Sequence, residues 1–253
     1  MKLATWNVNS LKSRLPHVLD WLAAHKPDFL LLQELKGTEL PEMELQAAGY
    51  TLTAVAQKAY NGVAILSRAP VTVIHQALPG DPSDDQARYL EVEQNGTRII
   101  NIYAPNGNPI GTEKFAYKMA WLGRLHTRLA DLRATGADFL IAGDFNIIPE
   151  DKDCYDPAAW AGDALFQPEP RAAYRALLHL GLTDALRALH PQPDLYTFWD
   201  YQAGAWPQNK GIRIDHILLS PRLADRLAAC AVDKAPRGLD KPSDHTPVLI
   251  ELA

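Results

Sequence analysis

Short runs of apolar residues, with polar residues at their edges, recur along most of the chain. Several runs alternate apolar and polar positions, as strands do when one face is buried, and others are apolar throughout. The dipeptides Asn61-Gly62 and Asn95-Gly96 separate neighbouring runs and favour hairpin turns. Ten strands are too many for one small sheet, so we predict a layered, largely antiparallel β structure. The runs are "LATWNVN", "FLLLQEL", "YTLTAVA", "GVAILS", "VTVIHQA", "RYLEVE", "TRIINIYAP", "DFLIAGDFN", "IRIDHILLS" and "PVLIEL".

Segments with the spacing of amphipathic helices lie between these runs. We predict a helix over residues 13–25, with Ser13 as its N-cap, and others over residues 112–135, 171–180 and 223–229. These helices would cover the outer faces of two stacked sheets. No internal repeat or low-complexity tract interrupts the pattern, so we predict one domain over residues 1–253.

The composition is that of a globular protein with a substantial core, since 47% of residues are hydrophobic and 22% are charged. A net charge of -5 argues against broad electrostatic capture of nucleic acid, but it allows a bound cation and a local basic rim. Cys154 and Cys230 are far apart and form no zinc-binding motif, so we predict reduced thiols. The chain has no signal-peptide pattern and no apolar run near the roughly 20 residues of a membrane span. We therefore expect a cytoplasmic protein without membrane contact.

Polar residues stand where several predicted strands end or begin. Taken singly, each is what turn chemistry places at a strand end. As a set they include carboxylates beside long apolar runs, which are costly to bury unless they are paired or bind a cation. Neighbouring strand ends in a sandwich can share one rim, so we expect these residues to converge on one cleft. The residues are Asn7, Glu34, Tyr103, Asp144, Asn146, Asp215, Asp244 and His245.

The donors in this set are mostly oxygen atoms. Carboxylates of Glu34 with Asp215 or Asp144, together with amide oxygens of Asn7 and Asn146, suit Mg²⁺ or Mn²⁺. A zinc site would use more nitrogen and sulfur ligands. The sequence therefore predicts a hard divalent cation, with Mg²⁺ as the cofactor and Mn²⁺ as a substitute.

Seven motifs, in this order, give the chain a resemblance to the exonuclease III type of apurinic/apyrimidinic endonuclease, within the endonuclease/exonuclease/phosphatase superfamily. "GDFN" or "SDH" alone would indicate only the superfamily, whereas "QELK" with "YAPNG" and "RIDHIL" narrows it to DNA-repair members. The motifs are "WNVNS", "LLQELK", "NGVAILS", "NIYAPNG", "GDFNI", "RIDHILLS" and "PSDHTPV".

The resemblance implies a four-layer α/β sandwich, with two mixed, largely antiparallel sheets packed face to face and helices outside. It also implies a hydrolase that cuts the DNA backbone 5′ to abasic sites, processes blocked 3′ ends and degrades duplex DNA from 3′ ends. The expected partner is double-stranded DNA with abasic sites or recessed or blocked 3′ ends, bound by a monomer.

The resemblance also implies roles for individual residues. Asp144 would orient or deprotonate the attacking water, and His245, held by Asp215, would contact the phosphate. Whether Asp144 is the base, or Tyr103 a nucleophile or acid, stays open. The implied metal residues are Asn7, Glu34, Asp144, Asn146 and Asp244, and the implied catalytic residues are Tyr103, Asp144, Asn146, Asp215 and His245. Phe198, Ile212 and Ile214 would line an apolar slot for a flipped, base-less sugar, with a place in the core as the alternative for Phe198 and Ile214, and Trp206 would be an exposed loop aromatic that touches DNA. The implied substrate contacts are Asn9, Arg88, Asn106, Phe198, Trp206, Ile212 and Ile214.

Three further points bear on function. Residues 150–171 have their own composition, and if they narrow the sugar slot, 3′-end processing would dominate over internal cleavage. The alternatives are a phosphoesterase acting on a small phosphorylated molecule and a non-catalytic DNA-binding module. Candidates for a local basic rim, each of which also suits an ordinary solvated charge, are Lys58, Lys118, Lys210, Arg213, Arg237 and Lys241.

Overall fold

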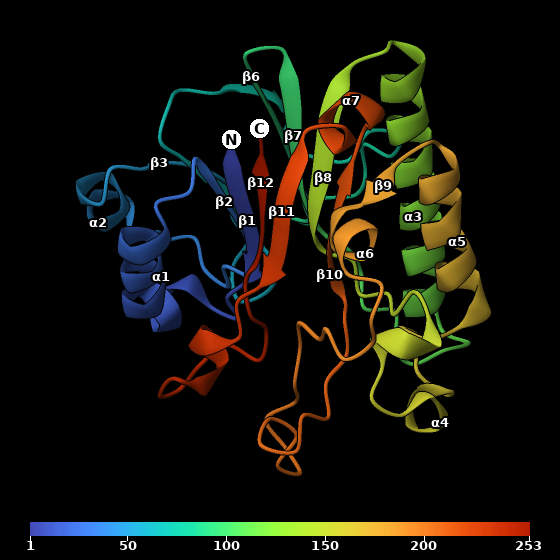
Figure 1. Cartoon of the computed structure of the whole chain (residues 1–253). Helices are drawn as coiled ribbons and strands as arrows, with labels where there is room; N and C mark the ends of the chain where they lie inside the picture. The colour runs from blue at the N-terminus through green and yellow to red at the C-terminus, as the bar shows by residue number, and fades with distance from the viewer.

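The computed structural model describes residues 1–253 and contains two six-stranded sheets that face each other, with helices on the outside (Figure 1). The predicted four-layer α/β sandwich is confirmed. The first sheet has the order β11-β12-β1-β2-β4-β3. Its strands are β1 (Lys2–Asn7), β2 (Phe29–Gln33), β3 (Thr51–Val55), β4 (Val63–Ser67), β11 (Leu227–Val232) and β12 (Val248–Leu252).

The second sheet has the order β5-β6-β7-β8-β10-β9. Each sheet contains one parallel pair, β1 with β2 and β7 with β8, and the remaining pairs are antiparallel. The sheets are therefore mixed. The strands of the second sheet are β5 (Thr72–His75), β6 (Tyr89–Gln94), β7 (Thr97–Tyr103), β8 (Asp138–Asp144), β9 (Thr183–Asp184) and β10 (Asp215–Leu219).

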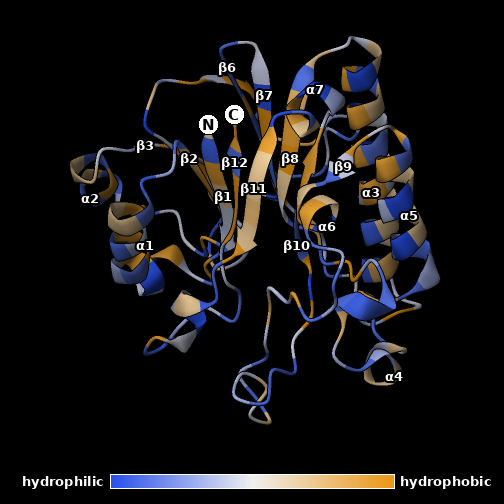
Figure 2. Ribbon diagram, viewed as in Figure 1, coloured by the Kyte–Doolittle hydropathy of each residue, from blue (hydrophilic) through white to orange (hydrophobic).

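Helices cover the outer face of each sheet. The first sheet packs against α1 (Leu11–His25) and α2 (Glu42–Ala47), and the second against α3 (Glu113–Ala134) and α5 (Pro168–His179) (Figure 1). Figure 2 shows the strands mostly hydrophobic and polar stretches on the helices and long loops. None of the helices has the length and hydropathy of a membrane span. The short helices are η1 (Asp151–Asp153), α4 (Pro157–Trp160), α6 (Ala185–Leu189), α7 (Pro221–Ala224) and η2 (Ala235–Gly238).

Two predictions about helices were wrong. The N-cap of α1 is Ser10, whose hydroxyl accepts a hydrogen bond from the backbone of Ser13 at 3.4 Å, so the helix begins earlier than predicted. The segment 223–229 is not one helix, because α7 ends at Ala224 and the strand β11 follows. Its apolar spacing also suits a strand, and pairing with β12 buries Cys230 between the sheets.

The space between the sheets changes from apolar to polar along its length. Alternate residues of a strand face the same side, so Leu3 and Asn7 of β1 both face the gap. On β8, Leu140 lies in the inter-sheet core and Asp144 ends the strand. The termini lie at the apolar end, and the long loop between α6 and β10 lies at the opposite end (Figure 1). The polar end carries the candidate site.

Candidate active site

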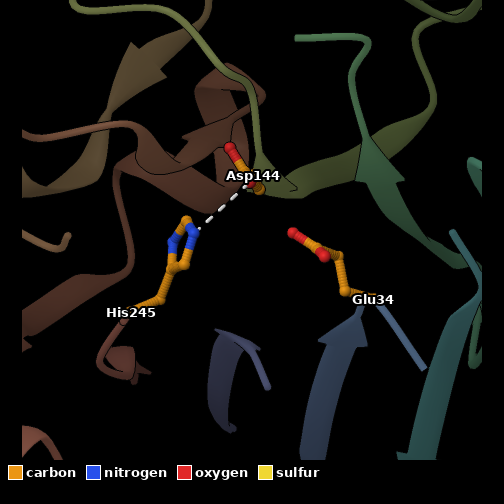
Figure 3. A group of neighbouring side chains, drawn as sticks. All are labelled: Glu34, Asp144 and His245. Atoms are coloured by element: carbon orange, nitrogen blue, oxygen red, sulfur yellow. Dashed lines mark ion pairs between the residues drawn. The ribbon is translucent and has the colours of Figure 1, made fainter. Parts of the chain in front are cut away.

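Three side chains from separate elements face one another at the polar end of the inter-sheet space (Figure 3). Glu34 follows β2 in the first sheet, Asp144 ends β8 in the second, and His245 precedes β12. Each offers one metal-ligating atom, and these atoms all lie within 4.8 Å of one another. The cluster is therefore built across the gap, and its geometry depends on how the two sheets are spaced.

Asn7 joins the two carboxylates of this cluster. Its Nδ2 donates hydrogen bonds to Glu34 Oε1 at 2.8 Å and to Asp144 Oδ2 at 3.0 Å. The parallel register of β1 and β2 pairs Asn7 with Gln33, which places Asn7 beside Glu34. Asn7 Oδ1 accepts from the backbone of Asn9 at 3.0 Å, so the amide oxygen faces this turn rather than the carboxylates.

Glu34 has a left-handed backbone conformation, with φ of 56°, which is uncommon outside glycine and is typical of strained functional positions. Its Oε2 lies 2.7 Å from the ammonium of Lys36. Burial acts to raise the pKa of Glu34, but the hydrogen bond and charge of Lys36 outweigh it and hold the pKa below its ordinary value. Glu34 is therefore ionised at neutral pH.

His245 is held by Asp215. The Nδ1 atom lies 2.9 Å from Asp215 Oδ2, so the ring donates from Nδ1 and turns Nε2 toward Asp144 Oδ2, 3.8 Å away. Burial acts to lower the pKa of His245, but the charges of Asp215 and Asp144 raise it above its ordinary value. The imidazole is therefore a buried cation at neutral pH. The antiparallel register that pairs Asp215 with Asp144 brings these groups together.

The carboxylates of the cluster fit a divalent cation. Burial raises the pKa of Asp144 despite the opposing charge of His245, so the ionised carboxylate is under-compensated. Asp215 Oδ1 is buried and has no hydrogen-bond partner. Three carboxylates, including Glu34, have only Lys36 and His245 as positive partners within ion-pair distance. A hard cation with oxygen ligands suits this donor set.

The "GDFN" motif positions Asp144 through its backbone. Gly143 has a φ of 147°, and a Cβ there would lie 2.0 Å from the carbonyl oxygen of Ile102, so only glycine fits. The backbone N–H of Asn146 donates to Asp144 Oδ1 at 2.9 Å. The side chain of Asn146 donates to the carbonyl of Ala104 at 2.9 Å, which fixes this turn against the end of β7.

Tyr103 lies beside Asp144 because the two residues are paired in the parallel register of β7 and β8. Burial raises the pKa of Tyr103 well above its ordinary value, and the charges of Glu34 and Asp144 add to this. The phenol is therefore a hydrogen-bond donor at neutral pH. The Arg88 guanidinium stacks over the Tyr103 ring at 4.9 Å. Arg88 also lines a cavity of about 350 Å³, together with Asn106, Lys114 and other residues.

The predicted slot residues occupy different environments. Phe198 is half-buried, and its ring meets the His245 ring edge-on at 5.0 Å. Ile212 and Ile214 are only 1% and 2% exposed, in a cluster with Cys154 and Leu165 of segment 150–171. The half-buried Trp206 lies against Trp199 and Arg237 instead, at 4.9 and 5.5 Å.

Asn9 and Asp244 lie together on the side of the cluster nearest the long loop. Asn9 Nδ2 donates to Asp244 Oδ1 at 3.1 Å and to the hydroxyl of Tyr201 at 3.2 Å. Asn106 Nδ2 donates to Asn146 Oδ1 at 3.3 Å on the other side. All residues predicted to bind the metal or catalyse the reaction thus lie around one end of the sandwich.

Comparison with known proteins agrees with this geometry. A model of the Endonuclease/Exonuclease/phosphatase family matches residues 4–245. Exodeoxyribonuclease III of Haemophilus influenzae is 35% identical over 99% of this chain and 99% of its own length. The chain belongs to the exonuclease III/AP endonuclease family. DNA repair nuclease APEX1 of Danio rerio is 30% identical over the whole of this chain and 82% of its own length.

Solved structures of this family superpose closely on the chain. The 3′ phosphatase NExo from Neisseria, bound to a product DNA hairpin, has a TM-score of 0.97 and 42% identity, covering 100% of this chain and 99% of that one. An AP endonuclease from Archaeoglobus fulgidus has a TM-score of 0.95 and 38% identity over the same shares. The resemblance seen in the sequence motifs is confirmed over the full length.

The prediction of a basic rim was wrong for three of its residues, which are buried. Arg237 is 6% exposed, and Arg213 is paired with Asp153. Lys118 is fully buried, and its Nζ donates to the carbonyls of Asn106, Asn146 and Ala164 at 3.0, 2.6 and 3.2 Å. Lys118 therefore braces the loops around Asp144. The helical spacing indicates that Lys118 is buried, because position 118 lies one turn from the buried positions 121 and 122.

Proposed function

We propose that the chain is a divalent-metal-dependent DNA-repair phosphodiesterase that acts on duplex DNA with abasic sites or with recessed or blocked 3′ ends. The observation that carries the proposal is the cluster of Glu34, Asp144 and His245, with Asp215 behind the imidazole, at one end of the sandwich. In this proposal residues 1–253 act as one domain, because the cluster needs side chains from both sheets.

We infer that the cation is Mg²⁺, with Mn²⁺ as a substitute. Glu34 and Asp144 would hold it, and Asn7, Asn146 and Asp244 would complete its surroundings. Buried carboxylates with excess negative charge support this assignment, since Mg²⁺ is bound in proteins by one or two carboxylates and several waters. When bound, the cation supplies positive charge that stabilises the oxygens of the phosphate.

His245 would donate a hydrogen bond from Nε2 to a non-bridging oxygen of the phosphate. Asp215 holds Nδ1 and keeps the ring protonated, as the acid does in an acid–histidine pair. A fixed cationic donor in a buried site stabilises the charge that develops on those oxygens, an effect typically of about 10² to 10³ in rate.

Asp144 would orient or deprotonate the attacking water. Asn7 and the backbone of Asn146 hold its two oxygens, so the carboxylate has a fixed direction. Tyr103, protonated at neutral pH, would donate a hydrogen bond to the phosphate or near the leaving oxygen. Together these groups supply an orientation for the nucleophile and a donor for the phosphate.

The remaining predicted contacts would hold the DNA. Arg88 and Asn106 line one cavity, and Asn9 lies at the opposite edge of the cluster. These three residues would contact the sugar-phosphate backbone of the DNA. Phe198 lies against His245 and would meet the sugar. Trp206 would contact DNA from the long loop, with Ile212 and Ile214 behind Phe198.

We further propose that 3′-end processing dominates over internal abasic cleavage. Ile212 and Ile214 are covered by Cys154 and Leu165 of segment 150–171, which leaves little room for a flipped sugar between them. Terminal 3′ groups do not need this space. The neighbouring structure named as a 3′ phosphatase supports the same preference.

Two duplex substrates test the function. One carries an internal abasic analogue and the other a 3′-phosphate at a recessed end, and each is incubated with Mg²⁺ or with EDTA. We expect Mg²⁺-dependent release of the 3′-phosphate and slower internal cleavage. If neither duplex is hydrolysed while a small phosphorylated molecule is, the alternative phosphoesterase is correct. If nothing is hydrolysed but DNA binds, the chain is a binding module.

A further inference from the structure

A layer of buried polar side chains separates the apolar inter-sheet core from the active site. Thr5 of β1, Gln33 of β2 and Asn101 of β7 are each 0% exposed. Gln33 Nε2 donates hydrogen bonds to Thr5 Oγ1 at 2.9 Å and to Asn101 Oδ1 at 2.7 Å. This contact joins the first sheet to the second.

Asn101 reinforces the connection from the other side. Its Nδ2 donates to the backbone carbonyls of Leu32 at 2.9 Å and Ala64 at 2.7 Å. Leu32 lies on β2 and Ala64 on β4, whereas Asn101 lies on β7 of the opposite sheet. One amide side chain therefore binds two strands across the gap.

We call the hydrogen bonds that Gln33 and Asn101 make across the gap the polar tie. The polar tie lies close to the carboxylates of the active site. Gln33 immediately precedes Glu34 in the chain. Asn101 is paired with Ala142, two residues before Asp144 on the same strand. The tie thus connects β2, which Glu34 follows, to β7, which is paired in parallel with the strand β8 that ends at Asp144.

Stability does not account for these amides. Burying an amide costs free energy unless every polar atom is satisfied, and Gln33 Oε1 has no hydrogen-bond partner. Replacing buried polar partners with apolar groups of similar shape is often neutral or stabilising. The rest of the inter-sheet core is apolar, so leucine or methionine would suit this layer too. Amides differ from them in fixing the distance between two backbones by directional bonds.

We propose that Gln33 and Asn101 are positioning residues that set the spacing between Glu34 and Asp144, and so set the affinity for the divalent cation. The inference rests on the proposed function. Outer-shell groups that orient metal ligands typically change metal affinity by about 10- to 100-fold when they are mutated. The same range is expected here, because Gln33 precedes Glu34 and Asn101 is paired with the strand that ends at Asp144.

The test is Mn²⁺ binding by the full-length Asn101→Leu variant, followed by electron paramagnetic resonance. In this variant Gln33 Nε2 keeps its bonds to Thr5 and to the carbonyl of Leu31. We expect Mn²⁺ affinity to fall by about tenfold or more. The thermal midpoint of the metal-free protein and its affinity for duplex DNA in EDTA should not fall. A merely structural role would lower the midpoint and leave Mn²⁺ affinity of the folded protein unchanged.

Gln33→Met provides the second variant, and it should weaken Mn²⁺ binding in the same way. Ser67→Ala is the matched control, because Ser67 is fully buried at the other end of β4 and its hydroxyl has no partner. Wild-type Mn²⁺ affinity in both tie variants would overturn this inference and leave the proposed function standing. Failure of both to fold would overturn it too, by showing that the tie serves stability. A wild-type protein that binds no Mn²⁺ would instead remove the proposed function on which it rests.

Discussion

Two clusters of charged side chains lie on opposite faces of β10, and they differ in how their charge is balanced. Asp215 faces the gap between the sheets and contacts His245 at 2.9 Å. His216, the next residue, faces the other side and lies 3.0 Å from Arg213. Strand geometry alone sends the two neighbours in opposite directions. From its proposed role we call the group of Asp144, Asp215 and His245 the catalytic cluster. The structural cluster consists of His216 and its charged neighbours Arg213, Asp153, Asp184 and Arg187.

The structural cluster is balanced by ion pairs. Arg213 lies 2.6 Å from Asp153 and 2.8 Å from Asp184, and Arg187 also pairs with Asp153. Despite burial, Arg213 and Arg187 hold the pKa of Asp153 at about 2. Burial, aided by Arg213, lowers the pKa of His216 to about 3, so the ring is neutral.

The catalytic cluster shows the opposite shifts. Burial raises the pKa of Asp144, and the charge of Asp215 adds to this against the opposing charge of His245. Despite burial, the charges of Asp215 and Asp144 raise the pKa of His245. Both clusters are buried and both contain histidine and aspartate. Burial therefore does not distinguish a reactive cluster from a structural one, whereas the balance of charge does.

Asp144→Asn has the largest expected effect and acts on the catalytic cluster. It removes the group that we propose orients or deprotonates the water, so kcat should fall by about 10² to 10⁴. The thermal midpoint should stay the same or rise, because a buried charge is removed. Single-turnover hydrolysis of the 3′-phosphate duplex and thermal unfolding measure the two quantities. An unchanged kcat would exclude Asp144 from the mechanism.

Asp153→Asn acts on the structural cluster and should give the reverse result. It leaves Arg213 and Arg187 with one fewer buried partner, and breaking a buried pair typically costs about 3 to 5 kcal/mol of stability. The kcat of the folded enzyme should be retained. Urea unfolding and active-site-normalised turnover test this. A loss of kcat without a loss of stability would contradict the division into two clusters.

The two histidines form a matched pair. His245→Asn should lower kcat by about 10² to 10³, because the proposed donor to the phosphate is lost. His216→Asn should leave kcat near the wild-type value and lower stability, since His216 lies against Phe145 and Tyr174. Equal effects on kcat from both variants would mean that the clusters are not separate.

Divalent cation should stabilise the protein through the catalytic cluster. At a Mg²⁺ concentration about 100 times its Kd, the free energy of unfolding should rise by about 2.7 kcal/mol. Glu34→Gln should abolish the increase, and Asp153→Asn should keep it. Thermal unfolding with and without Mg²⁺ provides the measurement. A cation effect that survives in the Glu34 variant would place the binding site elsewhere.

Acid stability should depend on the structural cluster. The pKa of Asp153 is lowered to about 2, against an unfolded value of about 3.9, so its contribution is complete above the unfolded pKa. That contribution, on the order of 2 kcal/mol, is lost as pH falls from about 4 to 2. Asp153→Asn should therefore flatten the stability profile in this window. An unchanged acid limb in urea unfolding would show that Asp153 is not strongly paired.

Much of the fold and site followed from patterns that are local in the chain. Strand alternation and polar strand ends gave the layers, and the shared rim of Asn7, Glu34, Asp144 and Asp215 is present in the structure. The helix prediction for residues 223–229 was wrong because the apolar spacing there suits helix and strand equally, and pairing with β12 decides in favour of the strand. The prediction that Lys118 and Arg213 contribute to a basic rim was wrong, because both are buried, whereas most lysine and arginine side chains are exposed.

The sequence by itself determined the layered α/β architecture, the family, the residues at the polar end and, through the two-residue period of a strand, the side of β10 that each residue faces. Only the tertiary structure decided which charges are balanced. Arg213 and Asp153 are 60 residues apart in the chain and 2.6 Å apart in the fold. Gln33 and Asn101 likewise meet only across the gap between the sheets. Charge balance and sheet spacing are sums over neighbours in space, and a linear pattern does not contain those neighbours.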